Sequence, residues 1–157
     1  MDDTDQQDLR PRRGTIERMD NVAIVVDDLA AAVAFFTELG LELDGRTTVE
    51  GGAVDRIVGL GGVRSDIAMM RTPDGHGRLE LIRYQTPSGP RGDRCAPANT
   101  LGLHRVMFAV DDIEDVLTRL RGHGAELLGE LVRFESFLMC YLRGPAGIIV
   151  ALAEQIR

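Results

Sequence analysis

The chain has 157 residues, 44% of them hydrophobic, and a formal net charge of −7. This length suffices for one domain with its own core, and no apolar run approaches the ~20 residues of a membrane span. The negative charge argues against nonspecific binding to nucleic acids or anionic membranes. Residues 1–13 lack the apolar core of a signal peptide. We therefore expect a cytoplasmic protein with no nucleic-acid or membrane partner.

A duplicated segment is the strongest pattern in the sequence. Residues 21–28 (NVAIVVDD) correspond to residues 105–112 (RVMFAVDD), 84 positions later, and the spacing holds through Gly40 and Gly124. A constant spacing across a strand-like run and a helix-like run indicates two copies of one structural unit. Sites in such folds form between the copies, at equivalent positions.

The first copy begins after a leader, residues 1–18, that we predict to be polar and disordered. A β-branched run at 22–26 predicts a strand, and Asp27 or Asp28 then caps a helix that ends at Gly40. Glycine pairs and a Pro-Asp-Gly turn separate the further strands that we expect, at 41–49, 54–60, 65–71 and 78–84.

The second copy follows a linker and repeats the plan. Residues 85–100 hold three Pro and two Gly, which is typical of a linker between modules at 19–84 and 101–157. In the second module Asp111 or Asp112 caps a helix to about 121, and strands are expected at 105–110, 126–132, 136–142 and 148–152. One module alone would expose an apolar sheet face, so we expect the two to enclose a cavity.

The order of strand, Asp-Asp, helix, Gly and a final Pro-x-Gly turn resembles the vicinal oxygen chelate superfamily. This superfamily contains glyoxalases, bleomycin-resistance proteins and extradiol dioxygenases, and the resemblance covers about residues 19–154. It implies an α+β fold of two paired βαβββ modules in one chain, with sheets that curl around a ligand cavity. Relatives commonly form dimers, so we expect a homodimer.

The resemblance also locates the metal ligands of metal-dependent relatives. Their four positions, on the first and last strands of both modules, correspond here to Asn21, Arg105, Glu80 and Ala151. Only Glu80 is a good ligand for a hard divalent ion, because Ala cannot ligate and Arg brings a fixed positive charge. His104 precedes Arg105 and should point to the opposite face. We therefore expect no metal and no other cofactor.

A charged pair is the replacement that we expect at this site. We predict that the Arg105 guanidinium pairs with Glu80, with Asn21 as an added hydrogen-bonding group. The alternative is that Arg105 extends to solvent and Glu80 finds another partner.

Strand alternation predicts the walls of the cavity. For residues 65–71 the alternation allows either Ala68 and Met70 or Asp66, Ile67 and Met69. The competing interpretation of the apolar members is that they are core. Cys140 should be a small core residue, and the roles of His104 and Cys95 stay open. The expected ligand-binding residues are Asn21, Glu80, Tyr84, Arg105, Met107, Met70, Phe137 and Tyr141.

These features favour a metal-free protein that binds and sequesters a small organic molecule. An alternative is a metal-independent isomerase, lyase or cyclase, with Glu80 or Tyr84 for proton transfer and Arg105 to stabilise an oxyanion. A weaker alternative is a glyoxalase-type metal-dependent lyase with other ligands. Whether the chain is an enzyme, and what its ligand is, the sequence leaves open.

Overall fold

A computed structural model describes residues 14–157. Most of the predicted leader, residues 1–13, therefore lies outside the described part. Residues 14–21 form neither helix nor strand.

The first module is a four-stranded sheet with strand order β1-β4-β3-β2, in which β1 runs parallel to β4 and the other pairs are antiparallel. Its elements agree with the expected strand–helix–strand plan apart from one short helix. They are β1 (Val22–Val25), α1 (Leu29–Leu39), β2 (Glu42–Glu50), α2 (Gly52–Val58), β3 (Arg64–Arg71) and β4 (Arg78–Thr86).

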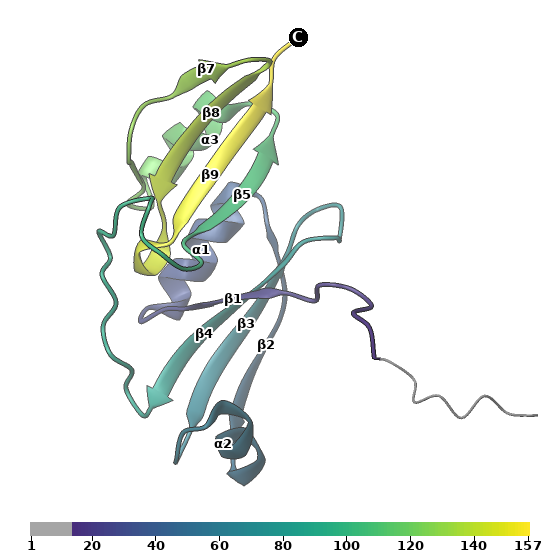
Figure 1. The fold of residues 1–157 in the computed structure, drawn as a ribbon, viewed down its shortest axis with the longest axis vertical. Coiled ribbons are helices and arrows are strands. Elements are labelled where there is room, and N and C mark those ends of the chain that lie inside the picture. The colour runs from purple at the N-terminus through teal and green to yellow at the C-terminus, as the bar shows by residue number, and fades with distance from the viewer. Residues whose placement is uncertain (1–13) are drawn as a thin grey trace, which may run out of the picture.

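The second module repeats this topology with strand order β5-β9-β8-β6, β7 pairing with β8, and β5 parallel to β9. A short 3-10 turn, η1 (Pro145–Gly147), precedes the last strand. The elements are β5 (Arg105–Val110), α3 (Ile113–Arg121), β6 (Glu126–Leu127), β7 (Val132–Phe134), β8 (Phe137–Arg143) and β9 (Ile149–Gln155). The α+β fold of two βαβββ modules is confirmed (Figure 1).

The second Asp of each Asp-Asp pair is the helix cap. The carboxylate of Asp28 accepts a hydrogen bond from the backbone N–H of Ala31 at 3.0 Å, and that of Asp112 accepts one from Asp115 at 3.0 Å. Each bond satisfies a backbone donor that has no partner within its helix.

The strand expected at residues 54–60 is wrong, because this segment forms α2. Asp55 accepts hydrogen bonds from the backbone N–H groups of Gly62 at 3.0 Å and Val63 at 2.8 Å, which closes the loop on the helix. These local bonds outweigh the β-propensity of the Val and Ile residues. No residue of α2 is buried, and Ile57 is 85% exposed.

The strand expected at residues 126–132 is also interrupted. Its two ends form β6 and β7, and Gly129 lies in the gap between them. A glycine inside a strand weakens it because it has no side chain to pack.

Both modules contribute to one hydrophobic core, which lies on the helix-covered face of each sheet. Phe36 of α1 and Phe108 of β5 bring the modules together, with ring centroids 6.5 Å apart. Arg119 of α3 also donates to Glu38 of α1 at 3.1 Å. The core residues in and next to the strands alternate on this face: Ile24, Val26, Ala68, Met70, Leu79, Leu81, Cys140, Leu142, Val150 and Leu152. Strand β9 is also buried on its other face, at Ile149, Ala151 and Ala153.

The linker between β4 and β5 runs along the outside of both modules (Figure 1). Arg94 pairs with Asp27 at the end of β1, and its hydrogen bond lowers the pKa of the Asp27 carboxyl. Arg143 donates to the backbone carbonyls of Ala96 at 2.6 Å and Gly147 at 3.1 Å. These contacts attach the linker to each module. Within residues 14–157, no helix is long and apolar enough to span a membrane.

Candidate functional site

The face of the first sheet that points away from the core carries Glu80 among apolar side chains, with Arg71 and Arg78 at one end. We call it the first open face. Ala23, Glu80 and Met69 are direct neighbours across β1, β4 and β3, and Val25 of this face is 57% exposed. The same alternation adds three side chains from β3 and β4: Ile67, Ile82 and Tyr84.

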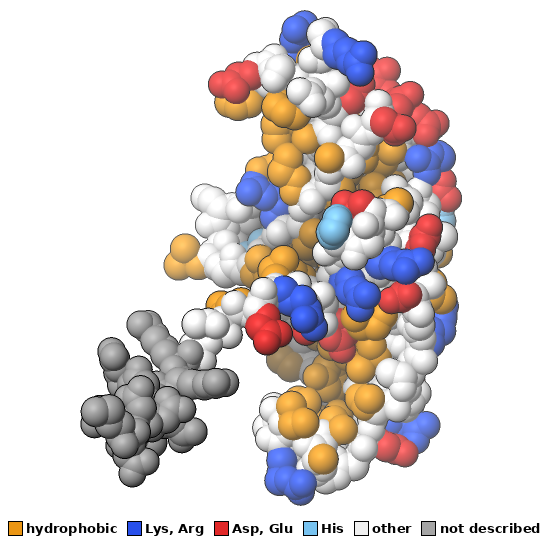
Figure 2. Space-filling model, turned by 90° about the vertical axis from the view of Figure 1, so that its right-hand side faces the viewer, with side chains coloured by type: hydrophobic (Ala, Val, Ile, Leu, Met, Phe, Trp, Pro, Cys, Tyr) orange, Lys and Arg blue, Asp and Glu red, His pale blue; other side chains and the backbone are white. Residues whose placement is uncertain are grey.

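The corresponding face of the second sheet, the second open face, carries positive charge instead. Met107, Ala151 and Tyr141 are neighbours across β5, β9 and β8, and Met107 is 50% exposed. Arg105 and Arg143 flank Ile149 in the next row. Further along, Ala109, Ala153, Met139 and Phe137 extend the apolar surface. Seen from the side, the molecule is elongated and hollowed, with hydrophobic side chains at its surface (Figure 2).

The registers of the two sheets place Glu80 and Ala151 at equivalent positions. Ala23 pairs with Glu80, and Met107, the repeat partner of Ala23, pairs with Ala151. The four positions that the resemblance associates with a metal are therefore Asn21, Glu80, Arg105 and Ala151.

These four residues do not fit a divalent metal ion. They offer one carboxylate and one amide beside a guanidinium and a methyl group, whereas Zn²⁺ or Fe²⁺ requires several N, S or O ligands. Among residues 14–157, no group of three or more His, Cys, Asp or Glu side chains is placed to hold a metal ion. The residues present therefore give no basis for a step that passes through a metal.

The ion pair predicted between Arg105 and Glu80 does not form within the described chain. No ion pair or hydrogen bond joins the two side chains, and no described residue pairs with the Glu80 carboxylate. Arg105 instead donates to the Tyr141 hydroxyl and lies over the Tyr141 ring, with Cζ 4.9 Å from the ring centroid. The prediction failed because Tyr141 holds the Arg105 guanidinium on the second sheet, and the strands of the two sheets do not pair with each other.

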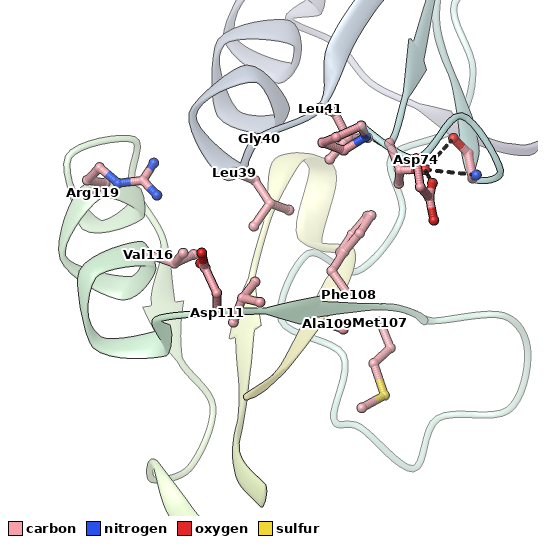
Figure 3. Close-up of a pocket in the computed structure, with 14 residues that line it drawn as sticks. Leu39, Gly40, Leu41, Asp74, Met107, Phe108, Ala109, Asp111, Val116 and Arg119 are labelled. Atoms are coloured by element: carbon pink, nitrogen blue, oxygen red, sulfur yellow. Dashed lines mark hydrogen bonds between the residues drawn. The ribbon is translucent and has the colours of Figure 1, made fainter. Parts of the chain in front are cut away.

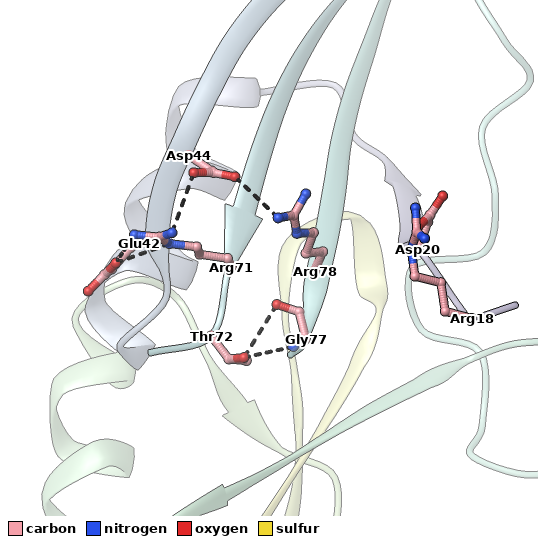
Figure 4. A network of polar contacts seen from close by, with 8 residues as sticks. All are labelled: Arg18, Asp20, Glu42, Asp44, Arg71, Thr72, Gly77 and Arg78. Atoms are coloured by element: carbon pink, nitrogen blue, oxygen red, sulfur yellow. Dashed lines mark hydrogen bonds and ion pairs between the residues drawn. The ribbon is translucent and has the colours of Figure 1, made fainter. Parts of the chain in front are cut away.

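Arg78, two residues before Glu80 on the same side of β4, has another partner. Its Nη2 lies 4.0 Å from Asp44, which also contacts Arg71 at 3.8 Å (Figure 4). Asn21 immediately precedes β1 beside Arg78 and is exposed. The arginine nearest to Glu80 on its strand is thus directed to an acid at the sheet edge.

Met70 does not belong to an open face. It is fully buried in the core beside Leu79, and its neighbour Met69 lies opposite Glu80. Of the two predicted sets, Ile67 and Met69 therefore face away from the core. Asp66, which the prediction grouped with them, lies on the other side of β3 with Ala68 and Met70. Met70 packs against the helices, where an apolar side chain avoids water.

Two clefts adjoin the open faces at different places. One of about 570 Å³ lies where the modules meet and is lined by Met107, Phe108, Leu41 and Asp74, among others (Figure 3). The other, of about 540 Å³, follows the linker and is lined by Tyr84 and Arg94. Met107 and Tyr84 thus line separate clefts in the part of the chain that the structure describes.

Arg143 is a residue of the second open face that the sequence prediction missed. It lies two residues after Tyr141 and four after Met139 on β8, so its side chain points to the same face, and strand alternation could have identified it. It is partly buried, and its guanidinium holds the carbonyl groups of the linker and of η1.

The remaining titratable candidates lie outside the two open faces. Burial raises the pKa of the Cys140 thiol, which lies in the core as expected. His104 is partly buried, and its Nε2 lies 3.1 Å from the carbonyl oxygen of Leu101. Cys95 is exposed and free.

Comparison with known proteins agrees with this architecture. The family model of the Glyoxalase/Bleomycin resistance protein/Dioxygenase superfamily matches residues 18–152. A glyoxalase family protein from Bacillus cereus is similar at 50% identity, covering 94% of this chain and 100% of that one, with a TM-score of 0.88. None of the curated proteins compared with the chain matches it.

More distant solved structures share the fold. A glyoxalase/dioxygenase from Nostoc punctiforme is 19% identical, with coverage of 94% and 97% and a TM-score of 0.63. A glyoxalase family protein from Enterococcus faecalis is 21% identical, with coverage of 88% and 98% and a TM-score of 0.59. The duplicated modules and the family match over most of their length lead to one conclusion: the chain belongs to the glyoxalase/bleomycin resistance protein/dioxygenase superfamily.

Proposed function

We propose that this protein binds a small organic molecule against the open faces of its sheets and needs no metal to do so. The observation that carries the proposal is that each sheet turns one largely apolar face away from the core, where Val25 and Met107 are at least half exposed. Apolar walls with a small number of placed polar groups are typical of small-molecule sites. Members of the superfamily often bind small molecules and form dimers.

The polar groups have distinct roles in this proposal. Arg105 and Tyr141 supply hydrogen-bond donors from the second open face, while Glu80 and Tyr84 supply an acid and a hydroxyl from the first. Phe137 and Met107 provide apolar contact area, and the flexible Met side chain adapts to the shape of a ligand. Asn21 adds an amide at the edge of the first open face.

The complete site is proposed to form in a homodimer, with the first open face of one copy opposite the second open face of the other. The supporting observation is the exposure of the faces: Val25 is 57% and Met107 50% exposed in one chain. Exposed apolar patches of this kind mark interaction sites or ligand grooves. A second copy would convert two open surfaces into one enclosed site.

Binding can be tested with the fluorescent probe 8-anilinonaphthalene-1-sulfonate and two variants. Met107→Glu places a carboxylate on the second open face and is expected to weaken binding of this anionic probe at least ~10-fold, since a like charge would face its sulfonate in a partly buried site. Ile57→Glu makes the same change on helix α2 and should leave binding unchanged. Wild-type affinity in Met107→Glu would contradict the proposal.

The metal-free part of the proposal has its own measurement. Elemental analysis of the purified chain is expected to find no stoichiometric Ni²⁺, Zn²⁺ or Fe²⁺, because the four equivalent positions hold one carboxylate only. One equivalent of such a metal, lost in Glu80→Gln, would overturn it. Native mass spectrometry of the same sample would give the mass of any small molecule that copurifies.

A further inference from the structure

The two open faces carry opposite charges that the described chain leaves unbalanced. Glu80 is the acid that lies among Ala23, Met69 and Ile82 on the first open face, and it is partly buried there. Arg105 lies on the second open face, where no acid pairs with it. A charge surrounded by apolar neighbours needs a partner once water is excluded.

The neighbouring charges on each face are already engaged. Arg78, two positions from Glu80, is directed to Asp44, and Arg143, across Ile149 from Arg105, donates to two backbone carbonyls. Neither face therefore neutralises its own charge through the nearest residues.

The Arg105 side chain is held in place before any acid reaches it. Its Nη1 donates to the Tyr141 hydroxyl, and its guanidinium lies over the ring, Cζ 4.9 Å from the centroid. Stacking on an aromatic ring and a fixed hydrogen bond lower the entropy that an ion pair would cost. Several guanidinium N–H groups remain for a carboxylate.

A second copy of this chain is the occupant that these features favour. Both charges belong to the same sequence, so two copies related by a twofold axis would make the same contact twice. The faces are also alike in their apolar character, so that each covers the other. Val25 and Met107 are at least half exposed in a single chain, and such a contact would remove both side chains from water.

We propose that Glu80 of one copy forms an ion pair with Arg105 of the second copy, so that the pair spans the homodimer interface at the base of the binding site. This inference rests on the proposed function for the existence of the dimer. It assigns to the second copy the partner that Glu80 lacks in its own chain.

Charge reversal tests the pair. Glu80→Arg places two guanidinium groups against each other in both symmetry-related contacts of the dimer, and Arg105→Glu does the same with two carboxylates. Each variant is expected to raise the dimer Kd at least ~10-fold, measured by sedimentation equilibrium, with the far-UV circular dichroism of the wild type. Glu130→Arg and Arg121→Glu, at exposed positions away from both faces, are controls for the change in net charge.

Mixing the two variants locates the pair between chains. A heterodimer of Glu80→Arg with Arg105→Glu restores opposite charges in both contacts, so an equimolar mixture should regain wild-type association and show the mixed mass in native mass spectrometry. The double variant, with both substitutions in one chain, is the comparison. If the double variant dimerises normally but the mixture does not, the pair lies within one chain and the proposal is wrong.

The remaining outcomes separate this inference from the proposed function. A wild-type dimer whose strength neither reversal changes overturns the ion pair and leaves ligand binding in place. A wild-type chain that stays monomeric overturns both the pair and the proposed dimer. Should the reversed variants misfold, Glu80→Gln and Arg105→Gln remove the pair without repulsion, and undiminished association in both would also overturn it.

Discussion

At the scale of single residues, Gly147 has the most restricted environment near the linker. Its φ is +84°, and a Cβ at this position would lie 2.6 Å from the backbone of Arg94. Gly147→Ala is expected to destabilise the fold by about 1–3 kcal/mol from the left-handed backbone alone, with a further cost from the contact. Denaturant unfolding measures this difference in free energy.

Gly129→Ala is the matched control for that substitution. A Cβ at Gly129 meets nothing within 4 Å, and its φ lies outside the left-handed region. We expect a change within about 0.5 kcal/mol. Equal effects of the two substitutions would show that the close approach to Arg94 does not constrain the linker.

Single residues also show how far sequence reasoning reaches. Side chains on β5 and β8 point alternately to the two faces of the sheet, so one assigned residue on a strand fixes the direction of the others. Met107 and Tyr141 were assigned to a common face in this way. On β3, Met69 and Met70 are both apolar, and their chemistry does not say which one is core. That choice depends on where α1 packs, which is information from outside the strand.

At the scale of elements, only the second aspartate of each Asp-Asp pair caps the helix that follows it. The Asp112 carboxylate accepts the Asp115 N–H at the start of α3, whereas no described residue makes a hydrogen bond to the Asp111 carboxylate. Asp112→Ala should cost about 1 kcal/mol of stability, a typical value for loss of an N-cap. Asp111→Ala should change it by less than about 0.5 kcal/mol. Thermal unfolding of both variants distinguishes them, and a larger effect at Asp111 would contradict the assignment.

Element boundaries were predictable where local signals agreed. The helix from Leu29 to Leu39 has an Asp before it and a Gly after it, so its limits follow from the sequence. The short helix α2 did not follow, because a β-branched run between glycines is typical of a strand. Its helical form depends on Asp55 reaching two backbone N–H groups across the next loop.

At the scale of the whole molecule, the repeat predicted two modules but not their spatial relation. The expected Arg105–Glu80 contact assumed that the first and last strands of both modules converge within one chain. Instead, α1 and α3 pack together and the core runs through both modules. Sequence symmetry specifies equivalent positions, and packing of the helices decides whether those positions meet in one chain or between two.

The shared core has a consequence for unfolding that the two tyrosines can report. Tyr84 lies in the first module and Tyr141 in the second, and the sequence has no other Tyr and no Trp. Tyr84→Phe therefore leaves fluorescence from the second module only, and Tyr141→Phe from the first only. Because Phe36 and Phe108 join the modules in one core, we expect both to unfold together. In each variant the fluorescence midpoint in denaturant should coincide with that of far-UV circular dichroism at equal protein concentration. A tyrosine signal that changes before the circular dichroism in one variant, and after it in the other, would show that the modules unfold independently.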